Sequence, residues 1–250
     1  MLLGASNLSR VFPRAIEALR ATQRGPLDAY VAMGFGRSYG QVSKFFSKKL
    51  LGILQSALWS ALDHATPIET SAIIADVGND LAYQTSVDAL VEWVREALDR
   101  LAAHRARVVL NNVPIESLRA VGPLRYHAVR TVLFPGCSIP YREMLRRVEE
   151  LHARLEELAR TREIPVFSAA GAWYGVDPIH PRTAHSGAIW QRMIGALGAP
   201  DAHVPWRAPA LSDQRALRWL QTRSWALGRA HGASPPQGTQ LRDGSTITLF

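Results

Sequence analysis

The clearest indication of the fold is the stretch Ser71-Ala-Ile-Ile-Ala-Asp-Val77, which is followed by Gly78-Asn79-Asp80. A short apolar run that ends at turn-forming residues is typical of a strand buried on both faces. Residues 87–101 come next, with apolar side chains three and four positions apart, and they predict an amphipathic helix. Residues 107–113 form another apolar run. A strand, a helix and a strand in this order predict a parallel pair joined by a crossover.

The same alternation extends in both directions from this unit. Further strands are predicted at 1–3, 28–33 and 164–168, and further helices at 9–23, 50–62, 141–163 and 183–197. The long helix at 141–163 could offer a coiled-coil partner face, but the strand directly after it favours ordinary packing. Residues 1–198 therefore predict a flavodoxin-like three-layer α/β/α sandwich. Its five-stranded parallel sheet has the expected strand order 2-1-3-4-5.

The character of the chain changes after Pro200. Residues 199–212 are rich in proline, and Ser234-Pro235-Pro236 is a second linker signal. Between them, residues 211–227 predict a short helix that carries Trp219 and Trp225. The last residues, 240–250, predict a hairpin, because Asp243-Gly244 suits a type I′ turn. We expect 199–250 to be a C-terminal extension packed on the core, since roughly 50 residues rarely bury a good core alone.

Composition narrows the class of protein. Of the 250 residues, 47% are hydrophobic and 20% are charged, which is typical of globular proteins and excludes disordered and fibrous chains. No apolar run reaches the ~18 residues of a membrane span, and the first residues lack the features of a signal peptide. A single cysteine, Cys137, excludes an internal disulfide and a multi-cysteine metal site. We expect a cytoplasmic protein.

The net charge of +8 comes almost entirely from arginine, with 26 Arg against 3 Lys. Together with the abundant alanine, this bias is typical of a GC-rich genome and suggests a bacterial origin. A basic chain could bind nucleic acid or an anionic surface. Its arginines, however, are spread along the chain among Asp and Glu, so we do not expect a nucleic-acid partner.

Polar residues follow each predicted strand, and in a parallel sheet the carboxyl ends of the strands form the ligand-binding edge. The segments in question are Gly4-Ala5-Ser6-Asn7, residues 34–40, Gly78-Asn79-Asp80, Asn111-Asn112 and Asp177-Pro178-Ile179-His180. A serine, glycine amides, an asparagine and a His/Asp pair are therefore expected at one edge. These groups are what acyl transfer requires: a nucleophile, oxyanion donors, a base and a residue that orients the base.

This ordered set resembles the SGNH (GDSL-type) hydrolases. In that family a nucleophilic Ser follows the first strand, a Gly the second and an Asn the third, and an Asp-x-x-His lies near the end of the domain. The sequence departs from the pattern in two places: Gly4-Ala5-Ser6 replaces Gly-Asp-Ser, and Gly78-Asn79 lacks the usual residue between glycine and asparagine. The first strand is also short, so either it is unusually short or the chain starts upstream of Met1.

The resemblance implies a role for each matching residue. Ser6 is the nucleophile, His180 the base and Asp177 the residue that orients it. The amides of Ser6 and Gly36 and the side chain of Asn79 form the oxyanion hole, and Gly36 is preferred to Gly34 in this role. The implied activity is hydrolysis of a small-molecule carboxylic ester, without metal or cofactor. An inactive binding domain and an acyltransferase are the alternatives; the oligomeric state is not predicted.

Simpler structural roles compete for several of these positions. Ser6 could cap the following helix, although Asn7 and Ser9 are better candidates as caps. Asn79 and Asp80 could form a turn and a cap, and we expect Asp80 to be structural. His185 is the nearest rival to His180.

Other segments near the predicted edge also allow two interpretations. Gly34-x-Gly36-x-x-x-Gly40 is similar to a dinucleotide loop, but it follows the second strand and has no acidic residue at a suitable later strand end. Asn111-Asn112 could line a pocket, although a loop cap before Pro114 is favoured. Phe45, Phe46, Leu50 and Leu51 could form an acyl-binding wall, but core packing is the commoner role of such residues.

Overall fold

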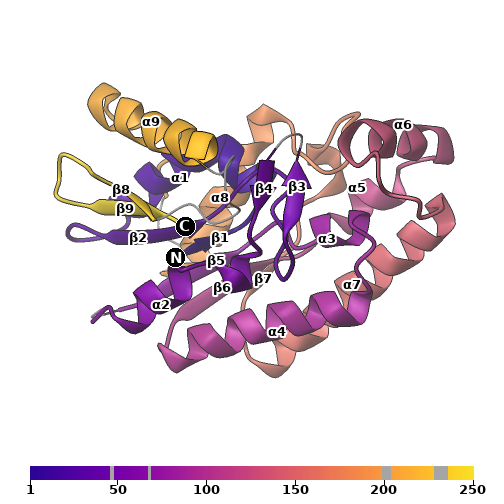
Figure 1. Cartoon of the computed structure of the whole chain (residues 1–250), viewed down its shortest axis with the longest axis horizontal. Coiled ribbons are helices and arrows are strands. Elements are labelled where there is room, and N and C mark those ends of the chain that lie inside the picture. Colours follow the sequence, from indigo (N-terminus) through magenta and orange to yellow (C-terminus); the bar gives the residue numbers. More distant parts are fainter. Residues whose placement is uncertain (46–47, 67–68, 199–203, 228–235) are drawn as a thin grey trace.

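The protein was analysed as a computed structural model, which describes residues 1–45, 48–66, 69–198, 204–227 and 236–250. Pro200, the linker signal at Ser234-Pro235 and Phe46 lie outside these residues, and so does the side chain of Trp225. Figure 1 shows a central sheet with helices on both sides. The strands are β1 (Leu2–Leu3), β2 (Asp28–Ala32), β3 (Ser43–Phe45), β4 (Lys48–Leu50), β5 (Ser71–Ile74), β6 (Arg107–Asn111), β7 (Val166–Phe167), β8 (Gln237–Gln240) and β9 (Thr246–Leu249).

The α-helices of the described residues are α1 (Ser6–Ala21), α2 (Leu58–Asp63), α3 (Asn79–Ala82), α4 (Val87–Ala103), α5 (Ile115–Arg119), α6 (Pro123–Leu133), α7 (Tyr141–Thr161), α8 (Thr183–Leu197) and α9 (Leu211–Leu227). The described residues also form two short 3-10 helices: η1 (Ile53–Gln55) lies between β4 and α2, and η2 (Gly171–Trp173) lies between β7 and α8. Among these helices, none is long and apolar enough to cross a lipid bilayer.

The main sheet has the order β7-β6-β5-β1-β2-β9-β8. The five strands predicted from the sequence are parallel and lie in the expected order, which confirms the flavodoxin-like sandwich. The predicted strand number was wrong, because β9 pairs in parallel with β2 and β8 pairs antiparallel with β9. The expected C-terminal hairpin therefore exists, but it extends the sheet to seven strands. Its predicted type I′ turn was wrong, because Gly244 has a positive φ and Asp243 does not. An edge strand pairs with its neighbour through backbone hydrogen bonds, so the side-chain pattern does not predict which strand that neighbour is.

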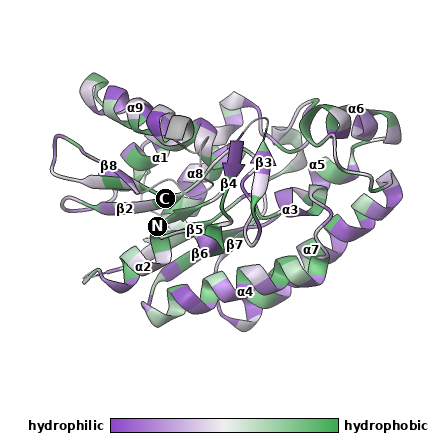
Figure 2. Ribbon diagram, viewed as in Figure 1, coloured by the Kyte–Doolittle hydropathy of each residue, from purple (hydrophilic) through white to green (hydrophobic). Residues whose placement is uncertain are grey.

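A separate hydrophobic core covers each face of the sheet. Along the strands, neighbouring side chains point to opposite faces, so Ile73 joins one core and Ile74 the other. The core that contains Ile74 is closed by α2, α4 and α7, whereas α1, α8 and α9 close the core that contains Ile73. Both α4 and α7 alternate hydrophobic and hydrophilic stretches along their length (Figure 2). Leu151, Leu155 and Leu158 form the buried stripe of α7.

The segment 50–62 does not form the single helix that its apolar composition predicts. It contains the end of β4, then η1 and α2. Gly52 separates them where the backbone passes close to the loop after β2: a Cβ atom at Gly52 would lie 2.8 Å from the amide nitrogen of Gln41. The backbone N–H groups of Ile53 and Leu54 then donate to the carbonyls of Ser38 and Tyr39, at 3.0 and 2.9 Å. These contacts tie the segment to the loop that carries Gly36.

Candidate active site

Ser6 is the first residue of α1, directly after the turn that leaves β1. Its side chain is buried, with 7% exposed. The structure rules out the capping interpretation, because the N-cap residue is Ala5 and no side chain caps this helix. Instead, Ser6 Oγ lies 2.8 Å from His180 Nε2, within hydrogen-bond distance.

His180 comes from the loop between η2 and α8 and is oriented by Asp177. The Nδ1 atom of His180 lies 2.6 Å from Oδ2 of Asp177. The other carboxylate oxygen, Oδ1, accepts hydrogen bonds from the backbone N–H groups of Ile179 and His180, at 2.9 and 3.2 Å. Because the carboxylate accepts from Nδ1–H, the neutral ring presents Nε2 as an acceptor to the Ser6 hydroxyl. The three side chains form one continuous chain of hydrogen bonds.

Burial alone would raise the pKa of Asp177. The hydrogen bond and charge of His180, together with the two backbone N–H donors, outweigh that effect and lower the pKa to about 2. The Asp177 carboxylate is therefore ionised over the whole pH range in which a neutral histidine exists. An ionised acceptor at Nδ1 stabilises an imidazolium ring when Nε2 takes up a proton.

The loop that carries this pair is held from several directions. The carbonyl of Ile179 accepts from the side-chain amide of Asn7 at 3.3 Å, and the carbonyl of Pro178 accepts from the Ser117 hydroxyl at 3.0 Å. Tyr174 and Pro181 form an isolated bridge across its base. These bonds fix the position of His180 relative to α1.

Gly36 and Asn79 lie at the same sheet edge, because they follow β2 and β5, the two strands that flank β1. Gly36 has a φ of +66°, in the left-handed region that favours glycine. Its carbonyl accepts from the Tyr83 hydroxyl at 2.6 Å, and a Cβ atom at Gly36 would lie 2.5 Å from that hydroxyl. Asn79 is the first residue of α3 and is 7% exposed. Among the described residues, neither Gly36 nor Asn79 forms a hydrogen bond with Ser6 or His180.

Asp76 is the residue of this site that the sequence analysis missed. Its Oδ2 accepts from the backbone N–H groups of Ala5 and Leu8, at 2.6 and 3.2 Å, and its Oδ1 accepts from Asn7 Nδ2 at 2.7 Å. A carboxylate thus lies at the N-terminus of α1, where the helix dipole stabilises negative charge, and it holds the turn that presents Ser6.

The backbone of Asp76 is itself unusual, with a φ of +62° in a residue that is not glycine. The sequence places Asp76 inside the predicted strand 71–77, but β5 ends at Ile74. A charged residue at the carboxyl end of an otherwise apolar run is the signal that could have identified it.

Asp80 is structural, in agreement with the sequence analysis. Its side chain is fully buried, and its Oδ2 accepts from the backbone N–H of Tyr39 at 3.0 Å. Burial raises the pKa of this carboxyl to about 6. The bond ties α3 to the loop after β2, so the elements that carry Gly36 and Asn79 are joined. Asp80 does not cap α4, whose first turn is capped by the Ser86 hydroxyl.

Two expected caps have other partners. Asn7 donates to Asp76 and Ile179, and the Ser9 hydroxyl donates to the Ala5 carbonyl at 2.7 Å, so neither caps α1. The capping prediction for these residues was wrong, because the carboxylate of Asp76 occupies the position that a cap would take. His185, the rival to His180, stacks against Trp173 with ring centroids 5.9 Å apart.

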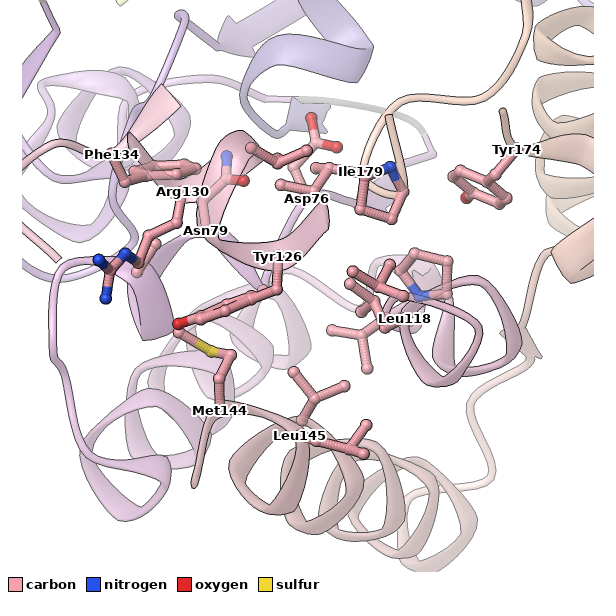
Figure 3. A pocket seen from close by; sticks show the side chains of 18 of the residues that line it. Asp76, Asn79, Leu118, Tyr126, Arg130, Phe134, Met144, Leu145, Tyr174 and Ile179 are labelled. Carbon is pink, nitrogen blue, oxygen red and sulfur yellow. The ribbon is translucent and has the colours of Figure 1, made fainter. Parts of the chain in front are cut away.

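An elongated cavity of about 130 Å³ lies beside these residues. One end is formed by Asp76 and Asn79 after β5, and the other end by Met144 and Leu145 on α7 (Figure 3). Asn111 and Asn112 both line it, and Asn112 Oδ1 also accepts from the backbone N–H of Val113 at 2.8 Å, so both interpretations of this pair hold. In the described part of the chain, no group of three or more His, Cys, Asp or Glu side chains is arranged to hold a metal ion.

The sheet order, with helices on both faces, is that of a flavodoxin-like three-layer sandwich. No protein-family model and no curated protein matches the sequence. Solved structures do match.

A candidate arylesterase from Agrobacterium tumefaciens str. C58 has a TM-score of 0.52 and 18% identity, over 78% of this chain and 95% of that one. A carbohydrate acetylesterase family member from Sinorhizobium meliloti has a TM-score of 0.50 and 12% identity, over 78% and 93%. The inhibitor-bound aryl esterase of M. smegmatis has a TM-score of 0.50 and 16% identity, over 78% and 94%. At these identities the likeness shows a shared fold.

Proposed function

We propose that this protein is a serine hydrolase of carboxylic esters, with Ser6 as nucleophile, His180 as general base and Asp177 as the residue that orients the base. The observation that carries the proposal is the hydrogen-bonded chain from Ser6 Oγ to His180 Nε2, at 2.8 Å, and from His180 Nδ1 to Asp177 Oδ2, at 2.6 Å. Nucleophile, base and orienting carboxylate in this geometry are the groups that acyl transfer needs.

The reaction follows from the positions of these atoms. Ser6 Oγ attacks the ester carbonyl carbon while its proton moves to His180 Nε2. The tetrahedral intermediate collapses, the bond to the alcohol oxygen breaks, and the imidazolium gives its proton to the departing alcohol. Water then attacks the acyl-enzyme in the same way, which releases the acid and restores the Ser6 hydroxyl.

The negative charge on the carbonyl oxygen needs donors that are already in position. We assign this role to the backbone N–H groups of Ser6 and Gly36 and to the side-chain amide of Asn79. As the first residue of α1, Ser6 has an N–H group without an intrahelical acceptor, at the positive end of the helix dipole. Gly36 and Asn79 support the assignment because they follow the two strands that flank β1.

An inactive binding domain on the same fold predicts that Ser6 and His180 lie apart, so the distance of 2.8 Å favours the hydrolase. An acyltransferase would use the same residues and differ only in the acceptor. The partner is a small-molecule ester, as the names of the arylesterase and acetylesterase neighbours suggest. A cytoplasmic location and the absence of a nucleic-acid partner stay predictions from the sequence.

The decisive experiment is labelling with a fluorophosphonate probe, which reacts with activated serines. The wild-type protein and Ser9→Ala should be labelled, and Ser6→Ala should not. Ser9 is a matched control because it is a buried serine on the same helix, three residues from Ser6. Equal labelling of Ser6→Ala and the wild type, or no labelling of either, would refute the proposal.

A further inference from the structure

The cavity beside Ser6 reaches from the sheet edge to the helices that follow β6. Its floor is formed by the residues after β5 and β6, and its walls come from α5, α6 and α7. Figure 3 shows Leu118, Tyr126 and Leu145 pointing into the space between these elements. It is a partly open site of small-molecule size, and its walls are mostly hydrophobic side chains.

This cavity is lined by residues that flank both reacting residues in the sequence, although Ser6 and His180 themselves do not line it. Asn7, which follows Ser6, and Ile179, which precedes His180, line it, and so does Asn79. The cavity therefore meets the proposed active site at Asn79, the side chain assigned to the oxyanion hole.

Polar side chains line both ends of this mostly hydrophobic cavity. At the sheet end, the side-chain oxygens of Asn7 and Asn111 are buried and accept no hydrogen bond from the described residues. At the helix end, most of the lining is hydrophobic, including Val129, Met144 and Leu145, but Tyr126 and Arg130 line it too (Figure 3). A ligand that fits this lining has a polar group at the sheet end and a hydrocarbon group against the hydrophobic side chains. The two free acceptors suit a water molecule or a substrate N–H or O–H beside the ester.

The volume limits the hydrocarbon group. A dry cavity of about 150 Å³ in another protein holds one benzene molecule. At about 130 Å³, this cavity suits one aromatic ring or a chain of about six carbon atoms. An acetyl group alone would leave most of it unfilled, and the lining side chains would then lack packing partners.

We infer that this cavity is the substrate-specificity site of the proposed esterase, and that it binds an aryl ring or an alkyl chain of about six carbons carried by the ester. The inference rests on the proposed function. Each methylene group moved from water into an apolar site raises kcat/KM about fourfold, so four buried methylenes give up to about 200-fold.

Three substrates test this and identify which side of the ester enters the cavity. Ethyl acetate is the reference, ethyl hexanoate adds four methylenes to the acyl side, and hexyl acetate adds four to the alcohol side. We expect one of the two longer esters to exceed ethyl acetate in kcat/KM by at least about tenfold. Neither exceeding it would overturn the inference.

The variant Val129→Phe adds four carbon atoms to a residue that lines the cavity, whereas Val132→Phe makes the same change at an exposed position of α6. We expect Val129→Phe to reduce the ratio of kcat/KM for the preferred long ester to that for ethyl acetate by about tenfold. Val132→Phe should leave the ratio unchanged. The ratio is measured within one protein, so a partly unfolded sample does not alter it. Equal ratios in the two variants would count against the cavity.

A binding measurement separates this inference from the proposed function. In Ser6→Ala, which cannot form an acyl-enzyme, a saturating amount of ethyl hexanoate or of hexyl acetate should raise the melting temperature, and the added Val129→Phe should remove that shift. If no ester is hydrolysed but this shift is found, the esterase proposal fails and the cavity still binds the hydrocarbon group. If esters are hydrolysed and no shift or chain-length preference is found, the cavity assignment fails and the esterase proposal stands.

Discussion

Replacing Asp76 by asparagine tests whether this carboxylate holds the turn that presents Ser6. Asparagine has nearly the same shape and tolerates the positive φ of +62°, so the change removes charge and one acceptor without adding backbone strain. Its carbonyl oxygen can take the place of Oδ2 and keep the bonds from the N–H groups of Ala5 and Leu8. Its NH₂ group would then face Asn7 Nδ2, so two donors would oppose each other where a bond of 2.7 Å existed.

The expected loss can be worked out from these contacts. One hydrogen bond to a charged group contributes about 1.5–3 kcal/mol, and a negative charge at a helix N-terminus contributes about 0.3–1 kcal/mol. Asp76→Asn should therefore lower the free energy of unfolding by about 2–4 kcal/mol. Asn7 could recover part of this by turning its amide around, but it would then lose its donation to the Ile179 carbonyl.

The assay is urea denaturation at neutral pH, with Asp88→Asn as the control. Asp88 also lies in the first turn of a helix, but it is exposed and pairs with Arg154 at the surface, so we expect a change below about 0.5 kcal/mol. A loss for Asp76→Asn no larger than the control would show that the carboxylate does not hold the turn. In the folded variant, kcat should fall, because Ser6 would be misplaced.

Four further predictions concern the site and the extension. Asp177→Asn should lower kcat by about 10⁴-fold, because the imidazole would favour the wrong tautomer, and near-normal activity in this variant would remove the residue from the site. Wild-type kcat/KM should rise with pH through the ionisation of the base and then level off, since the Asp177 pKa of about 2 keeps this carboxylate ionised throughout. Asn79→Ala should lower kcat by about 10²–10³-fold, whereas a rise in KM alone would make Asn79 a binding residue. Burial raises the Asp80 pKa from 3.8 to about 6, so the native state retains a proton that the unfolded chain releases, and wild-type stability relative to Asp80→Asn should fall by about 2 kcal/mol as pH rises from 4 to 7; a difference that does not change with pH in urea titrations would contradict this. A chain that ends at Leu197 should lose solubility, because removing β9 exposes the edge of β2 and removing α9 uncovers the core beneath it, and a soluble, equally active truncation would show that the extension is dispensable.

The local features of the fold could be predicted from the sequence. Apolar runs marked the five parallel strands, and the spacing of leucines marked α7, because periodicity is set by each element's own geometry. Ser6, Asp177 and His180 could be selected for the same reason. Each directly follows a strand or lies in a polar loop near one, and parallel topology brings such positions to one edge.

Long-range contacts could not be predicted in this way. Pairing of β9 with β2 joins residues more than 200 positions apart through backbone groups that every sequence possesses. The bonds from α1 to Asp76 depend on how two separate elements meet, and an aspartate at the end of a strand is equally common in a plain turn.

The cavity depends in the same way on the packing of α6 and α7 against the strand ends. In the described part of α6 no residue is buried, so its sequence has almost no hydrophobic periodicity from which the helix could be predicted. Periodicity and turn chemistry are encoded over a few residues, whereas strand partners, helix-to-loop bonds and cavities arise from the packing of distant segments, which single-sequence patterns do not record.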